Sequence, residues 1–360
     1  MSRLKVLCTV AAMGILAAGA VHAQADGRGR TLAVTMTNDS DQNQVKVYDG
    51  ATLALLQTLS TRGRGGAGGN ARGIKHYDGE LIAVVNNGSN SVALFRREGD
   101  RLTFSGTVST TSEPVSVDFA NGHMYVAGAT TVDSFVLHGR NTPLLDGTAW
   151  LELAGGGAPA PGSTAQIGVI NDRQLLVTLK TPDPGTVDIL ELEDGRITGS
   201  LTAVGAPAGT LTPFGFSVDP DGTALITLAG LAQNGIFRNG AFLSVIDAGQ
   251  GAPCWATRVG KYVFVANTGG RTISRLVGTG NNLFVDDETA ATIATGGGPA
   301  DIDADAGLLG VVDRGNGQSH LSLFTYNEFG ELTAHGQAIT IGVPSANGVA
   351  ILSPRRQGRD

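Results

Sequence analysis

The sequence predicts an all-β fold made of one repeated antiparallel unit, and three features of the chain support this prediction. Its 360 residues include 53 glycines and 13 prolines but only 5% aromatic residues, a composition suited to short strands joined by tight turns. A short apolar segment of strand character recurs seven times. The first and last copies of the unit are incomplete in complementary ways, so the two ends of the chain are expected to meet.

One complete copy of the unit lies at residues 251–276. A loop with glycine and proline leads into a strand at 255–259, and tight turns join this strand to an apolar strand at 262–267 and then to a third strand at 272–277. Consecutive strands joined by such short turns indicate an antiparallel sheet.

The same strands can be placed along the whole chain. The apolar second strand recurs at 32–36, 81–85, 124–127, 175–179, 224–228, 262–265 and 308–312. The third strand recurs at 45–48, 91–95, 132–136, 187–192, 242–246, 272–277 and 321–326. The first strands follow Arg72, Ser116, Gln166, Gly215, Trp255, Asp301 and Asn347, which stand 40 to 50 residues apart.

A four-stranded antiparallel unit of this length, repeated seven times, is typical of a seven-bladed β-propeller. The chain opens on a second strand and finishes on a first strand, at 349–352, so the C-terminal strand can complete the N-terminal blade. This closure would remove an open sheet edge. The alternatives are a β-solenoid or two sandwiches, which fit the repeat number and the phase of the two ends less well.

Fourth strands fit at 55–60, 102–109, 197–204 and 332–341. The fifth blade is the exception, because no strand fits between Asp247 and Pro253. We expect this blade to be short at its outer edge, or to use residues 231–239 irregularly.

Residues 1–23 have the features of an export signal. Arg3 and Lys5 precede an apolar run that is too short to span a bilayer, and Val21 and Ala23 are small residues at the expected cleavage site. We therefore expect a mature chain of residues 24–360 that forms one propeller domain, without a stable membrane anchor, in the periplasm or outside the cell. Its single cysteine, Cys254, allows no disulfide within the chain.

The net charge of −7 argues against nucleic acid as a partner. We expect a monomer that binds a small-molecule ligand or substrate. We expect no cofactor, and no metal site can be assembled from the histidines.

Several stretches carry a resemblance to a known family: TMTNDSDQNQVKVYDG, LIAVVNNGSNSVALFRREGDRL and APCWATRVGKYVFVANTGGRTIS. With the repeated aspartate-glycine turns, they resemble the lactonase-like seven-bladed propellers, the group of 6-phosphogluconolactonase and carboxymuconate cyclase. The likeness covers essentially the whole mature chain. It implies a hydrolase or cycloisomerase acting on a lactone-like molecule, although the export signal distinguishes this chain from cytoplasmic sugar-phosphate enzymes.

Propeller geometry predicts where a site would form. The turns between second and third strands and the connections between blades emerge on one face, around one mouth of the central channel. The connections contribute Arg72, Ser116, Gln166, Cys254, Trp255, Asp301 and Asn347. The turns contribute Asn38, Asn86, Asn87, Lys180, Asn267, Asp313, Arg314 and His320.

Lactone hydrolysis needs a base for water and a donor or cation for the oxyanion. His320 is the histidine that this argument places on the mouth face, so we predict that it is the base. Asp301 or Asp313 would orient it or act in its place, and Arg72 or Arg314 would bind a carboxylate or the oxyanion. We predict His320, Asp301 and Arg72 as the catalytic residues, with Asp313 and Arg314 among the substrate-binding residues. The alternative for His320 is a solvated turn residue.

The remaining mouth residues favour binding. Trp255 could stack on a ligand, and Cys254 is interpreted as a packing residue more readily than as a nucleophile, because no partner that would lower its pKa is adjacent in sequence. An amide-rich rim of Asn86, Asn87, Gln166, Asn267 and Asn347 binds without titrating. It supports the alternative function, a non-catalytic propeller that binds a small molecule or a protein on the same face.

Overall fold

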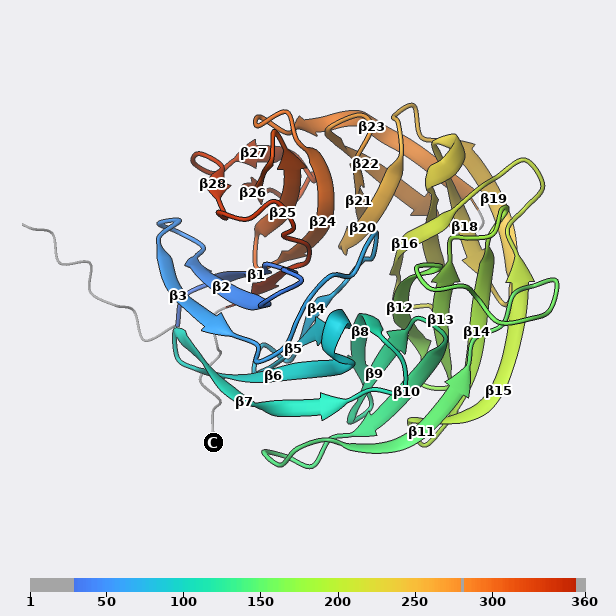
Figure 1. Cartoon of the computed structure of the whole chain (residues 1–360). Helices are drawn as coiled ribbons and strands as arrows, with labels where there is room; N and C mark the ends of the chain where they lie inside the picture. The colour runs from blue at the N-terminus through green and yellow to red at the C-terminus, as the bar shows by residue number, and fades with distance from the viewer. Residues whose placement is uncertain (1–28, 280–281, 354–360) are drawn as a thin grey trace, which may run out of the picture.

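The structure is a computed structural model that describes residues 29–279 and 282–353. Within these residues the strands form seven antiparallel sheets, arranged as blades around a central axis (Figure 1). The predicted all-β, seven-bladed propeller is confirmed. Two short 3₁₀ helices, η1 (Asn87–Ser89) and η2 (Ala229–Leu231), lie in turns. The predicted export signal at 1–23 lies outside the described residues.

Each blade runs from an inner strand at the channel to an outer strand at the rim, in the order given by hydrogen bonding. Blade one consists of β29 (Val349–Leu352), β1 (Leu32–Met36), β2 (Gln44–Asp49) and β3 (Leu55–Ser60). Blade two consists of β4 (Ile74–Tyr77), β5 (Leu81–Asn86), β6 (Ser91–Glu98) and β7 (Arg101–Ser109). Blade three consists of β8 (Pro114–Ala120), β9 (His123–Gly128), β10 (Thr131–Val136) and β11 (Leu144–Trp150). Blade four consists of β12 (Thr164–Asn171), β13 (Gln174–Leu179), β14 (Thr186–Glu193) and β15 (Arg196–Gly205).

The other three blades follow the same order. Blade five consists of β16 (Pro213–Val218), β17 (Ala224–Leu228), β18 (Gln233–Arg238) and β19 (Ala241–Asp247). Blade six consists of β20 (Pro253–Val259), β21 (Tyr262–Asn267), β22 (Thr272–Thr279) and β23 (Asn282–Thr292). Blade seven consists of β24 (Gly298–Asp305), β25 (Leu308–Gly315), β26 (Gln318–Tyr326) and β27 (Leu332–Ala334), with β28 (Ile339–Thr340) also paired to β26.

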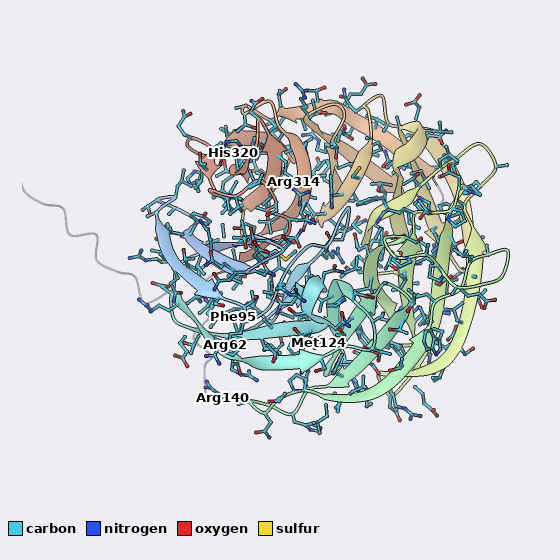
Figure 2. All side chains as sticks on the ribbon, in the orientation of Figure 1. Arg62, Phe95, Met124, Arg140, Arg314 and His320 are labelled. Atoms are coloured by element: carbon cyan, nitrogen blue, oxygen red, sulfur yellow. The ribbon has the colours of Figure 1, made fainter. Side chains whose placement is uncertain are left out.

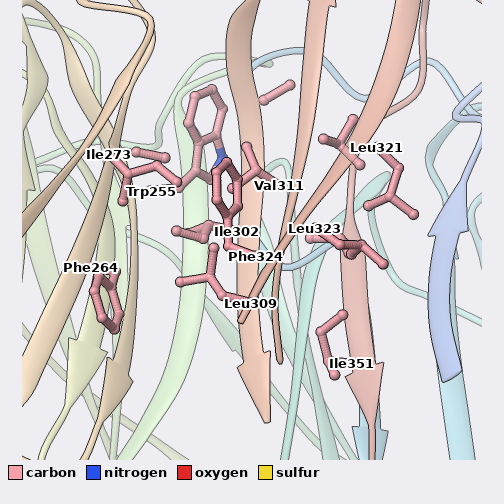
Figure 3. Packing of buried hydrophobic residues seen from close by; sticks show 14 of the residues in the cluster. Trp255, Phe264, Ile273, Ile302, Leu309, Val311, Leu321, Leu323, Phe324 and Ile351 are labelled. Carbon is pink, nitrogen blue, oxygen red and sulfur yellow. The ribbon is translucent and has the colours of Figure 1, made fainter. Parts of the chain in front are cut away.

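The second strand of each blade is continuously apolar because neighbouring blades cover both of its faces. All residues of β5 are buried, whereas buried and exposed residues mix along the outer strand β7. Aromatic and aliphatic side chains fill the space between blades six and seven, among them Trp255, Phe264 and Leu309 (Figure 3). Burial between blades, at about 25 cal/mol per Å² of apolar surface, is the main stabilisation of such a ring.

Blade five is complete, so the prediction of a missing or irregular outer strand is wrong. The segment at 242–246, interpreted as a third strand, belongs to the fourth strand β19. The third strand is β18, which pairs with β17 and β19 on its two sides. Residues 231–239 therefore supply the third strand and do not form an irregular insertion.

The C-terminal strand completes the N-terminal blade as predicted. β29 pairs antiparallel with β1, from Leu32 opposite Leu352 to Thr35 opposite Val349. Three carboxylates of β24 also bind the free edge of β29 and its continuation. Asp301, Asp303 and Asp305 accept hydrogen bonds from the backbone N–H groups of Val349 (3.3 Å), Ile351 (2.8 Å) and Ser353 (3.2 Å) respectively. We call these three side chains the carboxylate ladder.

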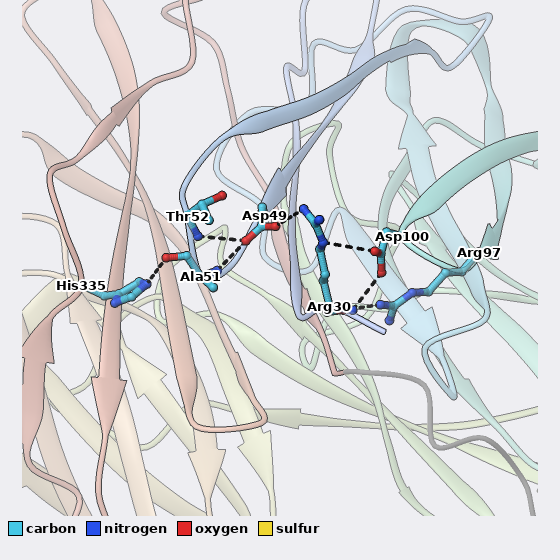
Figure 4. Close-up of polar contacts among 7 residues, drawn as sticks. All are labelled: Arg30, Asp49, Ala51, Thr52, Arg97, Asp100 and His335. Carbon is cyan, nitrogen blue, oxygen red and sulfur yellow. Dashed lines mark hydrogen bonds and ion pairs between the residues drawn. The ribbon is translucent and has the colours of Figure 1, made fainter. Parts of the chain in front are cut away.

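A single arginine holds both ends of the described chain. Arg97 donates from Nη1 to the carbonyl of Ser353 and from Nη2 to the carbonyl of Arg30, each at 2.5 Å. Arg30 in turn forms ion pairs with Asp49 at 2.6 Å and Asp100 at 3.2 Å (Figure 4). These contacts lie on the face opposite the predicted mouth.

Candidate functional site

The loop between blades one and two, residues 61–73, crosses the mouth of the channel (Figure 1). Its backbone reaches two distant blades, four and six. Ala71 donates to the carbonyl of Ala165 in blade four, Gly69 accepts from Lys180 at 2.7 Å, and Asn70 accepts from the indole Nε1 of Trp255 in blade six at 2.9 Å. We call this loop the channel plug. It occupies the opening around which the site was expected.

Asn70 anchors the channel plug by hydrogen bonds in several directions. Its side chain is completely buried, donates to the carbonyl of Val115 at 2.6 Å and accepts from Asn347. Arg72, which follows shortly after, has φ of 54°, a left-handed conformation that is uncommon for a residue with a side chain. Asn70 could not be identified from the sequence, because nothing in the spacing of the repeat marks a loop that turns inward.

Trp255 and Cys254 lie under the channel plug and not at an open rim. Trp255 is 6% exposed and packs edge-on against Phe214, with ring centroids 5.4 Å apart. Burial raises the pKa of the Cys254 thiol to about 11, so the thiolate needed for a nucleophile is disfavoured. Burial lowers the pKa of the nearby Lys180 to about 8.

The predicted amide rim is largely bonded within the protein. Gln166 exchanges two hydrogen bonds with the backbone of Phe216, at 2.8 and 3.0 Å. Asn86 and Asn267 are fully buried at the ends of their strands, and Asn87 donates to the carbonyl of Pro114 at 3.2 Å. Asn347, bonded to Asn70, belongs to the anchor of the channel plug. These amides hold the blades and the channel plug together.

Arg72, Asp301 and Arg314 gather on the channel side. Arg72 forms an ion pair with Asp118 at 3.7 Å, and both Arg72 and Arg314 interact electrostatically with Asp301. Arg314 donates to the carbonyls of Ala346 and Ser345, each at 2.8 Å. Burial raises the pKa of Asp301 to about 7, while its backbone donors and Arg72 oppose that increase. Its carboxylate oxygens accept from the backbone N–H groups of Ile302 and Val349.

His320 is paired with the other carboxylate that the sequence analysis offered, Asp313. Nδ1 of His320 lies 3.3 Å from Oδ1 of Asp313, and the two residues face each other across β25 and β26. Asp313 is completely buried, whereas the His320 side chain is 19% exposed. An ionised carboxylate only accepts hydrogen bonds, so Nδ1 is the donor and Nε2 of a neutral ring remains free to accept a proton.

Asp301 and His320 lie on opposite faces of blade seven. Asp301 stands opposite Val312, and Asp313 opposite His320, so the two aspartates project to different sides of the sheet. A bulge between Pro299 and Asp301 sets this register. Figure 2 shows Arg314 closer to the axis of the ring than His320. The structure thus brings Arg72, Asp301 and Arg314 together, and His320 separately with Asp313.

The His320 and Asp313 pair of blade seven occupies positions that carry uncharged side chains in blades two and six. The residue that corresponds to Asp313 at the end of the second strand is Asn86 in blade two and Asn267 in blade six. Asn267 donates to the hydroxyl of its cross-strand partner Thr272 at 3.2 Å and to that of Ser274 at 2.8 Å. Blade seven therefore has Asp and His where blade six has Asn and Thr.

Two buried oxygens lie beside the pair, Oδ2 of Asp313 and Oγ of Ser322. Burial raises the pKa of Asp313, and hydrogen bonds from Thr295, His320 and Ser322 oppose that increase. A carboxylate held in this way can orient a histidine and stabilise its protonated form.

The described residues also form a cavity away from the predicted mouth. A cavity of about 420 Å³ lies between blades one and seven on the opposite face, lined partly by Asp49, Leu308 and His335. Within residues 29–279 and 282–353, no group of three or more His, Cys, Asp and Glu side chains is arranged to hold a metal ion. No helix in these ranges is long and apolar enough to cross a bilayer.

Solved structures with a similar fold include proteins named for reactions of lactones. The periplasmic gluconolactonase PpgL of Pseudomonas aeruginosa superposes with a TM-score of 0.64 at 18% identity, over 91% of this chain and 99% of that one. A candidate 6-phosphogluconolactonase of Bacteroides fragilis gives 0.66 at 14% identity, over 91% and 99%. An inactive variant of virginiamycin B lyase of Staphylococcus aureus, solved with quinupristin, gives 0.57 at 14% identity, over 79% and 92%.

These likenesses show a shared propeller fold over almost the whole described chain. No family model matches the sequence, and no curated protein matches it significantly. The expected resemblance to the lactonase-like propellers is thus supported by structure, at low identity.

Proposed function

We propose that this protein is an exported hydrolase that opens a small lactone, with His320 as the base and Asp313 as the residue that orients it. The observation that carries the proposal is the replacement of the Asn267 and Thr272 pair of blade six by a carboxylate and an imidazole in blade seven. In blade six, an amide and a hydroxyl are sufficient to connect the second and third strands at this position. A titratable pair adds the ability to move a proton.

Two further observations support the proposal. The proteins of similar fold include a periplasmic gluconolactonase. The export signal expected at residues 1–23 would direct this chain to the same compartment. The His320 side chain is partly exposed, so part of the imidazole is open to solvent.

In the proposed reaction, Nε2 of His320 takes a proton from water as the water oxygen attacks the lactone carbonyl carbon. The tetrahedral oxyanion then collapses and breaks the ring C–O bond. The leaving alkoxide takes the proton from the imidazolium, and the product is an open-chain hydroxy acid. The Asp313 carboxylate holds Nδ1–H and stabilises the imidazolium while it exists.

The proposal gives Asp301 and Arg72 no part in proton transfer. Asp301 uses its oxygens on backbone N–H groups, as Asp303 and Asp305 of the carboxylate ladder also do. Arg72 belongs to the channel plug and is paired with Asp118. We assign both residues to the closure of the ring and its channel.

The test converts blade seven to the pattern of blade six. We expect Asp313→Asn with His320→Thr to fold with unchanged thermal stability, because blade six contains this pair. We expect its kcat for lactone hydrolysis to fall by at least about 100-fold, the contribution typical of a general base. Acid release in a pH-stat, with the spontaneous rate subtracted, measures the reaction on a panel of five- and six-membered lactones.

The matched control is His138→Ala, which removes an exposed histidine from a different blade and should leave the rate unchanged. Equal rates for the wild type and the blade-six mimic would contradict the proposal. Lack of turnover of every lactone by the wild type would favour the alternative, a propeller that only binds.

A further inference from the structure

Thr295 is the third residue in contact with the His320 and Asp313 pair. It lies in the connection from blade six to blade seven, and its hydroxyl donates to Oδ1 of Asp313 at 2.6 Å. This is the same oxygen that faces Nδ1 of His320 at 3.3 Å. The shorter of the two contacts with Oδ1 therefore comes from the loop and not from the imidazole.

The direction of the Thr295 hydroxyl is fixed by a second contact. The backbone N–H of Gly297 donates to Oγ1 of Thr295 at 3.1 Å, so that oxygen is already an acceptor and its proton is available for Asp313. Gly297 has no side chain, and a Cβ there would overlap Oδ1 of Asp313. The loop can approach the carboxylate this closely because residue 297 is glycine.

The loop is itself held in place at its start. The N–H of Ile293 donates to the carbonyl of Arg271 at 2.9 Å, and the N–H of Gly296 donates to the carbonyl of Ile293 at 3.0 Å. Ile293 is buried among the core residues of blades six and seven. Thr295 is therefore presented to Asp313 by a segment with fixed geometry.

Blade six shows what the corresponding loop does without a titratable pair. The N–H of Ala248 donates to the carbonyl of Ala232, and the N–H of Ile293 donates to the carbonyl of Arg271; each acceptor directly precedes the third strand of its blade. Gln250 and Thr295 each lie two residues after these donors, so they occupy equivalent positions in the two loops. Gln250 accepts a hydrogen bond from Thr272 at 3.1 Å and makes none to Asn267. In blade seven the loop residue donates, and its partner is the carboxylate.

From this geometry we infer that Thr295 is a positioning residue for the His320 and Asp313 pair: it turns Oδ1 of Asp313 toward Nδ1 of His320 and keeps the carboxylate ionised. The inference rests on the proposed function, in which this pair moves the proton. Without the Thr295 donor, the buried carboxylate loses one of the hydrogen bonds that stabilise it as an anion. Protonation of Asp313 would remove the acceptor for Nδ1–H.

The test uses Thr295→Val, which keeps the shape and removes the hydroxyl, and Thr295→Ser, which restores it. We expect Thr295→Val to lower kcat about tenfold, the effect of one hydrogen bond of about 1.4 kcal/mol to a charged group, with KM within about twofold. The acid limb of its kcat/KM profile should move to higher pH. Thr295→Ser should recover both. Gln250→Ala, in the equivalent loop of blade six, is the control and should match the wild type.

A second measurement separates this inference from the proposed function. The imidazole NMR signals of His320, assigned by their loss in His320→Thr, report the titration of the pair without substrate. In Thr295→Val their acid-side transition should move to higher pH and return in Thr295→Ser. Identical titrations in wild type and Thr295→Val overturn the inference even if lactones are hydrolysed. A shifted titration in a protein that hydrolyses no lactone supports the positioning role and overturns the proposed function alone.

Discussion

Trp255 links the channel plug to blade six through one hydrogen bond from a buried side chain. Its indole N–H satisfies the carbonyl of Asn70, which has no access to solvent. Because the bond is made by the ring nitrogen, Trp255→Phe keeps most of the packing and leaves that carbonyl unpaired. We expect the free energy of unfolding to fall by about 1–3 kcal/mol, measured by urea denaturation.

The control for this change is the other tryptophan. Trp150 on β11 is 69% exposed, so Trp150→Phe should change the free energy of unfolding by less than about 0.5 kcal/mol. Equal losses in the two variants would show that the contact with Asn70 does not hold the channel plug.

At the residue scale, the sequence supplied candidate side chains but not their grouping. Both aspartates and the histidine of blade seven were candidates, and the structure pairs His320 with Asp313. The choice depends on the bulge between Pro299 and Asp301, which changes the face on which Asp301 projects. A bulge has no clear mark in a single sequence. Thr295 was missed for a related reason, since a threonine in a connecting loop resembles many others.

The third strands of blades three and four begin with the same three residues, Thr-Val-Asp, and they differ in how the aspartate is satisfied. Asp133 accepts from the N–H of Thr111 and from the hydroxyls of Thr111 and Thr148. Asp188 accepts from the N–H of Glu152, and its Oδ1 has no partner among the described residues. Burial raises the pKa of Asp188 to about 7.

This difference predicts a pH-dependent stability. The pKa of Asp188 is raised above its unfolded value of about 3.9, so the folded state binds more protons, and stability is lost as the pH rises from about 4 to 7. Asp188→Asn removes the buried charge. We expect it to raise the Tm at pH 8 relative to the wild type and to change it little at pH 4, measured by calorimetry.

Asp133→Asn is the matched comparison. Both carboxylate oxygens of Asp133 accept hydrogen bonds, and the substitution replaces one of them by an NH₂ group, which cannot accept. This variant should therefore have a lower Tm than the wild type at pH 8. A lower Tm for Asp188→Asn at pH 8 would contradict the argument from the unpartnered oxygen.

At the element scale, the apolar second strands were predictable because burial on both faces leaves a continuous apolar run. The third strand of blade five was not. β18 begins Gln-Asn-Gly, and Asn234 is completely buried. Gly235 leaves space that the ring of Phe242 fills. The following strand β19 has the apolar alternation expected of a third strand, so the order of the two was misread.

The ring is closed by more than the pairing of β29 with β1. The carboxylate ladder adds hydrogen bonds along the free edge of β29, on the channel side. The channel plug joins the first two blades to blades four and six across the axis. The closure of the two ends could be predicted from the phase of the repeat. The plug could not, because its glycine-rich sequence is equally compatible with a solvated loop.

Removal of the C-terminal strand should therefore prevent folding. β29 contributes four fully or almost fully buried apolar residues. At about 1.5–3 kcal/mol for each large side chain, their loss approaches the 5–15 kcal/mol that stabilises a typical protein. We expect a chain that ends at Gly348 to be aggregated or unfolded by gel filtration and circular dichroism.

A chain that ends at Ser353 keeps β29 and the contact with Arg97, and it should behave as the full-length protein. Cooperative unfolding of the shorter chain at the wild-type temperature would show that the ring is stable without its closing strand.

Because Arg97 binds the carbonyls of both Arg30 and Ser353, the described chain enters and leaves the ring side by side, on the surface away from His320. A purification tag, reporter domain or immobilising linker fused directly before Arg30 or directly after Ser353 would therefore start from that surface. A protein immobilised through either fusion would have the proposed reaction centre on its far side.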